Sequence, residues 1–555
     1  MRYYRNISLF AAHLPMQRLI TSHLRPVIGL IIVLVLGNHQ SAFADKGTSR
    51  AQLLRVKNLM NANDFAAAWR LIATLEKSDT VSAELYYMGG TCLYSLKEFA
   101  DAIPRFERSI RLNPDKDIEK YYMLGRVYHS NGKPHQAIAA YESFLAKSPA
   151  NKEESKEAAL YLAQSKRAIE WMTKPMDVRL INLGDSINTE FNEYNPSLAA
   201  DGLTLIFTSR RPETTGKKQD PDDGLFLEDI YISYRNPETG HWSEAHQVEG
   251  NLNTDAHDAN LCLSPDGNQM FVYRNMGERG SGEIYLSKLS RNGKWSAAKK
   301  VEGEINSSYF ESSACLNPDG NKLYFVSERE KKGFGMGDIY ISKKVDKKWA
   351  SPENLGPEIN DEYDQIGIFI HPDGKTLYFA SDNPKGMGGY DIYKSSLVND
   401  KWSAPENLGY PINTHGDERF IHLSTDGNSA WISSNRLGGK GGIDIWEIDL
   451  SNLAKDDNTK SLLPEEKSIS ILSGQVIDTK SSPVADAEIQ ITETPGGAYY
   501  TVTSDENGKY FITLAGNKNY QVQVKHPGFK PNNFHIFVQA KEKGTFTNEK
   551  MIVLE

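Results

Sequence analysis

The chain has 555 residues, which corresponds to roughly three to five domains at about 100 to 200 residues per domain. Its 39% hydrophobic and 24% charged residues are values of a globular protein and exclude both a disordered chain and a multispanning membrane protein. A net charge of −9, from 63 Lys and Arg against 72 Asp and Glu, argues against nucleic acid as a partner. The three cysteines, Cys92, Cys262 and Cys315, are too few for a disulfide framework or a cysteine-rich zinc site, so we expect no metal and no cofactor.

Residues 1–44 have the features of a secretory signal peptide. They contain four Arg and no acidic residue, then an apolar run over Val27–Leu36, and then Ala42-Phe43-Ala44, a small-x-small site for signal peptidase. This apolar run is shorter than the ~20 residues that span a bilayer, although a retained membrane anchor stays an alternative. Because the leader is long, a translation start at Met16 is a second alternative. We therefore expect an exported, periplasmic protein.

Residues 50–172 carry a helical repeat with a period of about 35 residues. Small residues at Gly90 and Gly125 would let paired helices approach, and a proline would end the second helix of each unit. The pattern resembles the tetratricopeptide repeat, which implies an α-solenoid of roughly three to four units whose concave surface binds a peptide or a partner protein; a simple spacer is the alternative. The signature positions are Tyr86, Gly90, Ala102, Phe106 and Pro114 in one repeat and Tyr121, Gly125, Ala137, Tyr141 and Pro149 in the next.

A second repeat, rich in β-formers, covers residues 178–450. Asp-Gly turns recur in it, most of them 53 or 54 residues apart, and each lies between two alternating apolar runs, which is a strong hairpin signal. A third strand follows with the pattern Asp/Glu-Ile-Tyr/Trp, and a fourth begins at a tryptophan. Four strands over about 50 residues predict a propeller blade, and five such units predict a five-bladed β-propeller. The turns begin at Asp201, Asp266, Asp319, Asp373 and Asp426.

The two ends of this second repeat predict how the ring closes. The last unit stops after Trp446 without a fourth strand, whereas an orphan strand at 180–184 precedes the first unit. Pairing that strand with the last unit would close the ring and leave no open edge. The turn Ser264-Pro265-Asp266-Gly267 and the recurring Asp-Ile-Tyr strands resemble the PD40 or TolB-like propeller repeat. This resemblance implies the same propeller fold.

Each predicted blade carries an acidic or amide residue eight positions before its Asp-Gly aspartate. These residues would lie beside the innermost strand, as a ring around the axis that could hold a cation or a cationic ligand. The second strand of each blade ends in a basic or amide residue, and the amide Asn383 occurs in the same blade as the amide Gln365. This correlation favours a structural acid–arginine pair in each blade over a ligand site. In blade order the two sets are Glu193, Asp258, Glu311, Gln365 and Glu418, and Arg210, Arg274, Arg329, Asn383 and Arg436.

Three further features of this region have structural explanations. The glycine-rich stretches 333–337 and 438–442 precede no helix, so we expect turns and not phosphate-binding loops. The first blade has an insertion within 212–227 whose acids could bind Ca²⁺, although their spacing is not that of an EF-hand. Cys262 and Cys315 occupy equivalent positions in adjacent blades, where buried thiols are favoured and a disulfide is the alternative.

A polar linker, 451–470, precedes a third region at 471–555. Short alternating strands in this region predict an antiparallel β-sandwich. The turn Asp505-Glu506-Asn507-Gly508 and the pair Gly528-Phe529 resemble the carboxypeptidase regulatory-like domain, which has a transthyretin-like fold. The resemblance implies a structural or adhesive module without peptidase activity.

Compact catalytic signatures do not occur in the sequence: it has no His-Glu-x-x-His, no Gly-x-Ser-x-Gly and no P-loop motif. A glycoside hydrolase needs only two carboxylates about 5 to 10 Å apart, so an acidic axis leaves a glycan-binding or glycan-hydrolysing propeller as the alternative function. Acids that recur in every blade together with arginines are more typical of architecture than of catalysis. We therefore expect no enzymatic activity.

The order of helical repeat, propeller and transthyretin-like sandwich resembles envelope proteins of Bacteroidota that are linked to type IX secretion, above all the PorE-like family. The resemblance implies a non-enzymatic periplasmic scaffold that binds envelope proteins through its solenoid and propeller, with a peripheral association with the outer membrane. Those relatives are lipoproteins that end in an OmpA-like peptidoglycan-binding domain. This sequence shows no lipobox cysteine and reaches Glu555 about where that domain would begin, so we do not expect peptidoglycan binding.

Overall fold

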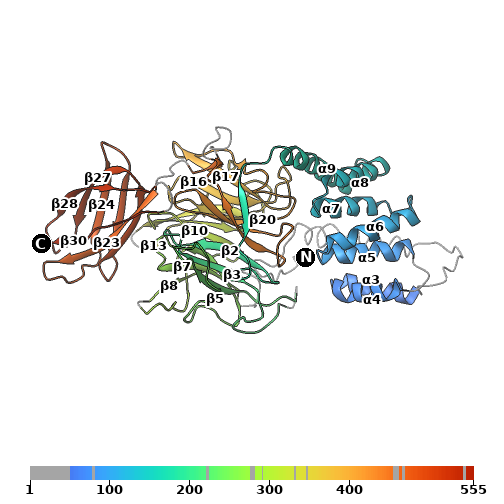
Figure 1. Cartoon of the computed structure of the whole chain (residues 1–555), viewed down its shortest axis with the longest axis horizontal. Helices are drawn as coiled ribbons and strands as arrows, with labels where there is room; N and C mark the ends of the chain where they lie inside the picture. Colours follow the sequence, from blue (N-terminus) through green and yellow to red (C-terminus); the bar gives the residue numbers. More distant parts are fainter. Residues whose placement is uncertain are drawn as a thin grey trace.

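The computed structural model describes residues 50–555 apart from 78–81, 221–223, 276–281, 291, 330–332, 346–347, 454–461, 465–468 and 542–544. The predicted signal peptide lies outside the described residues, as does most of the predicted linker. Figure 1 shows three parts in a row: a stack of helices, a central region of β-sheets, and a β-sandwich at the C-terminal end. Within the described residues, no helix is both long and apolar enough to cross a membrane.

The helical part, which we call the solenoid, is a series of antiparallel helix pairs. Its core depends on the glycines of the repeat, because a Cβ on Gly90 would lie 2.8 Å from the ring of Phe106, and one on Gly125 would lie 2.5 Å from the ring of Tyr141. Pro114 and Pro149 follow the ends of two helices, as predicted. The helices are α3 (Arg50–Asn61), α4 (Phe65–Leu75), α5 (Ala83–Ser95), α6 (Phe99–Leu112), α7 (Glu119–Ser130), α8 (Pro134–Lys147) and α9 (Glu153–Met172).

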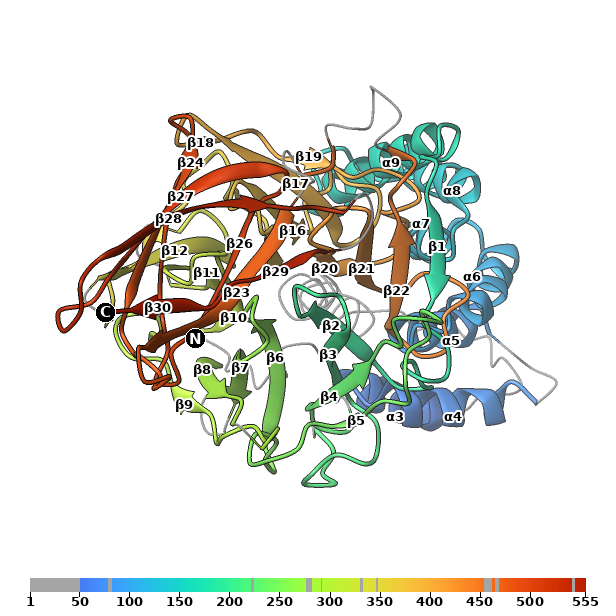
Figure 2. The same ribbon diagram turned by 60° about the vertical axis from the view of Figure 1, so that its left-hand side comes forward.

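The central part, which we call the ring, consists of five antiparallel sheets that follow one another in chain order (Figure 2). The first strand of each sheet contacts the first strand of the next, and β20 of the last sheet contacts β2 of the first, so the circle is complete. The sheets are β2 (Glu193–Leu198), β3 (Thr204–Ser209), β4 (Asp229–Tyr234) and β5 (His246–Gln247); β6 (His257–Leu263), β7 (Gln269–Asn275), β8 (Glu283–Lys288) and β9 (Lys299–Lys300); β10 (Glu311–Leu316), β11 (Lys322–Ser327), β12 (Asp338–Val345), β13 (Lys348–Trp349) and β14 (Glu353–Asn354); β15 (Gln365–Ile370), β16 (Thr376–Ser381), β17 (Asp391–Val398), β18 (Lys401–Trp402) and β19 (Glu406–Asn407); and β20 (Glu418–Leu423), β21 (Ser429–Ser434), β22 (Asp444–Asp449) with β1 (Arg179–Asn182).

The strand before the first sheet completes the last sheet. β1 pairs antiparallel with β22, in a register that places Arg179 opposite Asp449 and Asn182 opposite Trp446. The predicted pairing of the orphan strand with the last repeat unit is therefore confirmed. Because this strand covers the outer edge of β22, the last sheet has four strands, like the first and second sheets.

The C-terminal part is a sandwich of two sheets with a continuous apolar core that includes Leu472, Ile489 and Val522. It begins two residues before the predicted boundary, at Ile469, and it touches the ring through Thr545, whose hydroxyl donates to the carbonyl of Ala200 at 2.8 Å. One sheet contains β23 (Ile469–Asp478), β26 (Lys509–Ala515), β29 (Thr547–Glu549) and β30 (Ile552–Leu554), and the other contains β24 (Glu488–Thr494), β25 (Tyr499–Thr503), β27 (Lys518–Lys525) and β28 (Asn532–Val538).

Candidate functional site

The acidic residues predicted to surround the axis are buried, and each is bonded within its own sheet. Glu418 accepts from the backbone N–H of Thr414 at 2.7 Å, from the Ser434 hydroxyl at 2.6 Å and from Arg436 at 3.2 Å. Glu311 has the equivalent partners, including Arg329 at 3.4 Å. Burial raises the pKa of both glutamates, whereas their arginine and hydroxyl partners oppose that shift. These carboxylates are therefore occupied by contacts inside the sheets.

The first sheet corrects one predicted partner. Arg211, and not Arg210, contacts Glu193, with 3.3 Å between Arg211 Nη2 and the carboxylate. Successive side chains of an extended segment point in opposite directions, so only one of two adjacent arginines can face the glutamate. Arg210 is also fully buried, but its Nε donates to the carbonyl of Phe226 and its guanidinium lies 3.9 Å from Asp220 of the insertion.

The second and fourth sheets vary the same arrangement. Arg274 lies directly opposite Asp258 in the strand register and donates to it at 2.6 Å. In the fourth sheet the carboxylate lies four residues earlier in the sequence than in the other sheets. It belongs to Asp361, which accepts from Gln365 at 2.8 Å and from Asn383 at 2.7 Å. Gln365 and Asn383 therefore both bond to Asp361, a residue that belongs to neither of the two sets of equivalent positions found in the sequence.

The glycine-rich stretches are turns whose backbone N–H groups are already bonded. Phe334 and Gly335 donate to the carboxylate of Asp338 at 2.6 and 3.0 Å. Lys440 and Gly441 donate in the same way to Asp444 at 2.5 and 2.9 Å. Each aspartate opens the third strand of its sheet, so it anchors the preceding turn and leaves these N–H groups engaged.

The insertion of the first sheet and the cysteines also take structural positions. Asp220 is buried and lies 3.5 Å from the Nε2 atom of His257, while the neighbouring acids of the Ca²⁺ hypothesis, at 222 and 223, lie outside the described residues. Within the described residues, no group of three or more His, Cys, Asp or Glu side chains could hold a metal. Cys262 and Cys315 are buried free thiols, so no disulfide joins the two sheets in this structure.

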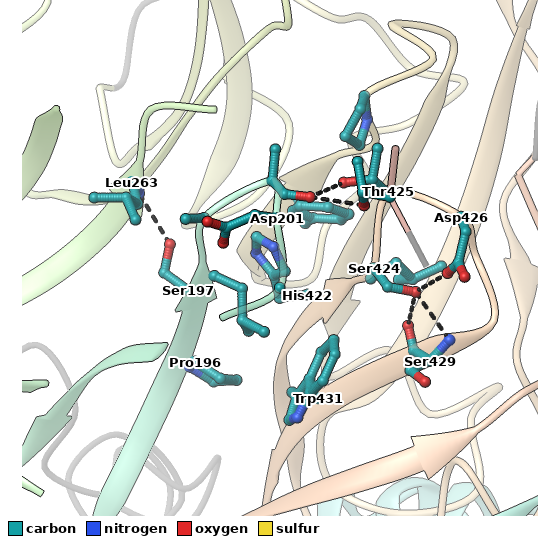
Figure 3. Close-up of a pocket in the computed structure, with 18 of the residues that line it drawn as sticks. Pro196, Ser197, Asp201, Leu263, His422, Ser424, Thr425, Asp426, Ser429 and Trp431 are labelled. Atoms are coloured by element: carbon teal, nitrogen blue, oxygen red, sulfur yellow. Dashed lines mark hydrogen bonds between the residues drawn. The ribbon is translucent and has the colours of Figure 1, made fainter. Parts of the chain in front are cut away.

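A pocket of about 560 Å³ lies on the axis of the ring and has the sandwich residue Thr545 in its lining; Figure 3 shows some of its residues. We call it the axial pocket. Its lining comes from the first strands of the sheets, from the turn around Asp201 and from the sandwich. His422 lies inside it, and Trp431 forms part of its lining.

The solenoid is fixed to the ring on the opposite side by a row of hydrogen bonds to one loop. Gln164 of α9 donates to the carbonyl of Gly388, and Arg167 donates to the carbonyls of Pro384 and Gly386 at 3.1 and 2.9 Å. His129 of α7 contacts the carbonyl of Met387 at 3.0 Å. The loop at 384–388 therefore presents its carbonyls to the side chains of two solenoid helices.

Beside this junction lies a cavity of about 350 Å³, which we call the interdomain cleft. Solenoid and ring each supply one wall. Arg126 stacks on Tyr161, with its guanidinium carbon 3.8 Å from the ring centre, and lies 3.9 Å from Glu157. Burial lowers the pKa of His129 to about 3 and that of His415 to about 4, so both imidazoles are neutral at pH 7. The lining residues that the argument below uses are Arg126, Glu157, Leu160 and Tyr161 on the solenoid and Asp382, Asp417 and Leu437 on the ring.

Sequence families identify the two ends of the chain. The carboxypeptidase regulatory-like domain family matches residues 471–549, and the tetratricopeptide repeat family matches residues 53–117 and 122–168. The C-terminal sandwich is therefore a carboxypeptidase regulatory-like domain, and the solenoid consists of tetratricopeptide repeats, as predicted. No curated protein sequence matches the chain.

Three solved structures each resemble a small share of the chain. A 3-chlorocatechol 1,2-dioxygenase from Rhodococcus opacus 1CP is 11% identical, with 16% of this chain and 59% of the dioxygenase covered and a TM-score of 0.14. YrrB, described as a TPR protein with an unusual peptide-binding site, is 18% identical, with 22% and 59% covered and a TM-score of 0.20. PcrH from Pseudomonas aeruginosa is 17% identical, with 22% of this chain and 99% of PcrH covered and a TM-score of 0.20. The chain thus spans 59% of the length of the first two structures, and these local likenesses carry no functional inference.

Proposed function

We propose that this protein is a non-enzymatic scaffold that binds a partner protein at the interdomain cleft. The observation that carries the proposal is the shared construction of the cleft, because tetratricopeptide repeats commonly bind proteins and here their helices form a wall together with the ring. Leu160 and Leu437 stand on the two sides of the cleft with exposed fractions of 48% and 61%. Exposed apolar side chains beside a cavity are typical of a protein interaction site.

The finer parts of the proposal rest on the sequence resemblance. We propose that the ring, residues 178–450, is a five-bladed β-propeller of the PD40 type, a proposal supported by the five consecutive sheets and by the pairing of β1 with β22. We also propose that the protein is exported to the periplasm. There it would serve a Bacteroidota envelope assembly linked to type IX secretion, with peripheral association with the outer membrane. The solenoid at 50–172 and the sandwich at 471–555 would then be two further folding units beside the propeller.

Burial of the repeated carboxylates favours this scaffold over a glycan-hydrolysing propeller. Glycoside hydrolysis needs two carboxyl groups that can reach the same sugar. Glu193, Glu311 and Glu418 are fully buried and line neither the axial pocket nor the interdomain cleft. Their hydrogen bonds and ion pairs instead hold the strands of each sheet together.

The test is site-specific photocrosslinking in cells. A photoreactive amino acid replaces Leu160 or Leu437, and a third variant carries it at Leu54, which is equally exposed on α3 and does not line the cleft. We expect the two cleft positions to capture the same envelope protein, identified by mass spectrometry, and Leu54 not to capture it. Equal capture from all three positions, or recovery of polysaccharide fragments without a protein, would overturn the proposal.

A further inference from the structure

The inner strands give the axial pocket much apolar lining. Three of the five innermost strands supply Leu261, Ile368 and Ile421 to it, and Phe369 and Leu423 add further apolar surface. Charged side chains line it as well: Arg235 pairs with Glu447 at 3.1 Å, and Arg179, Asp201, Asp426 and Asp449 also belong to the lining. Against the apolar side chains of the inner strands, a charged ligand would lose its hydration without gaining an opposite charge.

Polar residues also line the pocket, and two residues of the last sheet in its lining, His422 and Trp431, lie next to each other. His422 of β20 is directly opposite Trp431 of β21 in the antiparallel register. The indole N–H of Trp431 is buried and has no hydrogen-bond partner among the described residues. The His422 ring packs against Phe369, with ring centres 4.4 Å apart, and none of the hydrogen bonds of the described residues involves its nitrogens. The buried N–H of Trp431 does not open on the pocket, so the ring nitrogens of His422 are the groups of this pair that a ligand can reach.

The imidazole of His422 is neutral at physiological pH. Burial lowers its pKa to about 3, and the neighbouring His371 contributes in the same direction. A neutral imidazole offers one donor and one acceptor, so it can bond to a hydroxyl, a carbonyl or an amine without requiring a charge on the ligand.

We propose that the axial pocket binds an uncharged, mainly apolar small molecule that carries a hydrogen-bonding group directed at His422. Its volume of about 560 Å³ is large enough for a small ligand, because pockets for such molecules usually measure about 300 to 1,000 Å³. Asp201 and the sandwich residue Thr545 also belong to the lining of this pocket. This site is independent of the interdomain cleft and of the proposed partner.

Two thiols in the pocket provide a direct readout. Cys262 and Cys315 both line the axial pocket, whereas Cys92 is buried in the core of the solenoid. In the full chain carrying Cys92→Ser, the rate at which the neutral reagent monobromobimane labels Cys262 and Cys315 reports access to the pocket. The probe is 1-aminoanthracene, a neutral aromatic amine whose fluorescence rises in apolar surroundings.

We expect saturable binding of 1-aminoanthracene and at least a fivefold slower labelling of the two cysteines when it is bound. His422→Phe keeps a ring against Phe369 but removes the imidazole nitrogens, and we expect it to weaken 1-aminoanthracene by about 5- to 10-fold while leaving the affinity for anthracene unchanged. Ile368→Trp fills the pocket and should weaken both probes. Circular dichroism melting confirms that each variant is folded.

The proposal is overturned if folded protein shows no saturable binding of either probe. It is also overturned if Ile368→Trp binds both probes as tightly as the unchanged chain, or if bound probe leaves the labelling rate of both cysteines unaltered. The photocrosslinks at Leu160 and Leu437 test the interdomain cleft, which lies on the other side of the ring. A negative result in the ligand-binding experiment therefore leaves the scaffold proposal untouched, and a negative crosslinking result leaves the ligand proposal untouched.

Discussion

The side chain of Asn188 holds the backbone of Ile445, 257 residues later in the chain. It accepts from the Ile445 N–H and donates to the Ile445 carbonyl, both at 2.9 Å. We call this pair of hydrogen bonds an asparagine clamp. It recurs in the other sheets, where the asparagine comes after the strand that it contacts in the sequence. The equivalent pairs are Asn253 with Ile230, Asn306 with Ile284, Asn360 with Ile339 and Asn413 with Ile392. Only the Asn188 clamp joins the two ends of the ring.

Asn188→Ala should lower the free energy of unfolding by about 1 to 3 kcal/mol, because the Ile445 N–H would lose its bond to Asn188 and the Ile445 carbonyl would keep the Leu183 N–H, at 3.2 Å. Urea denaturation followed by tryptophan fluorescence measures the change. Asn292→Ala, at an exposed position, is the matched control and should stay within about 0.5 kcal/mol. Equal stability of the two variants would mean that the clamp does not contribute to closure.

Gly125→Ala should destabilise the solenoid by about 1 to 3 kcal/mol, since the new Cβ would lie 2.5 Å from the Tyr141 ring. At an exposed helical glycine the same substitution would stabilise the protein, because alanine has a better helix propensity than glycine by up to about 1 kcal/mol. Thermal melting by circular dichroism at 222 nm measures the effect. In a Tyr141→Leu background the clash is relieved, and Gly125→Ala should become neutral or stabilising; a stabilising effect in the unchanged chain would refute the packing explanation.

Arg211→Met should destabilise the ring by about 2 to 4 kcal/mol, because the fully buried Glu193 would keep its charge without the cation. The double variant Arg211→Met with Glu193→Gln should recover at least half of that loss, since the amide carries no charge. Guanidinium denaturation of the four proteins gives the coupling free energy. Additive effects of the two substitutions would show that Arg211 and Glu193 act independently.

Acid should weaken the junction between solenoid and ring through His129. Its pKa is lowered to about 3 by burial, by the neighbouring His415 and by Arg126, against about 6.5 in the unfolded chain. The unfolded state therefore binds the proton more tightly, so the stability that neutral His129 contributes is present above about pH 6.5 and is lost as the pH falls towards 3. At pH 5 this amounts to about 2 kcal/mol, at 1.36 kcal/mol per pH unit.

The measurement is the pH dependence of unfolding between pH 4 and 8, combined with limited proteolysis near residues 173–178. His129→Gln retains a hydrogen-bonding side chain but cannot titrate, so its stability curve should be flatter across this range. If His129→Gln shows the same slope as the unchanged chain, the acid sensitivity belongs to other groups, such as His415 or His422.

Periodic features of the sequence predicted most of the architecture. The predictions used the glycines and prolines of the helical repeat, the Asp-Gly turns and the incomplete last unit. Each of these is a local conformational preference or a repeat count, so it can be recognised without knowing which distant residues are in contact. The predicted pairing of the orphan strand with the last sheet followed from the same count. The sequence did not predict the interdomain cleft, because Leu160 lies in the solenoid and Leu437 in the ring, and neither residue belongs to a motif.

The sequence by itself determined the helical repeats, the order of the β-units and the regulatory-like sandwich, since each depends on short-range patterns of apolar and turn residues. Only the tertiary structure decided which of Arg210 and Arg211 faces Glu193, that Asp361 supplies the carboxylate of the fourth sheet, and where the two cavities lie. These features depend on side-chain direction and on contacts between residues more than 200 positions apart, such as Gln164 with Gly388, which no local pattern encodes.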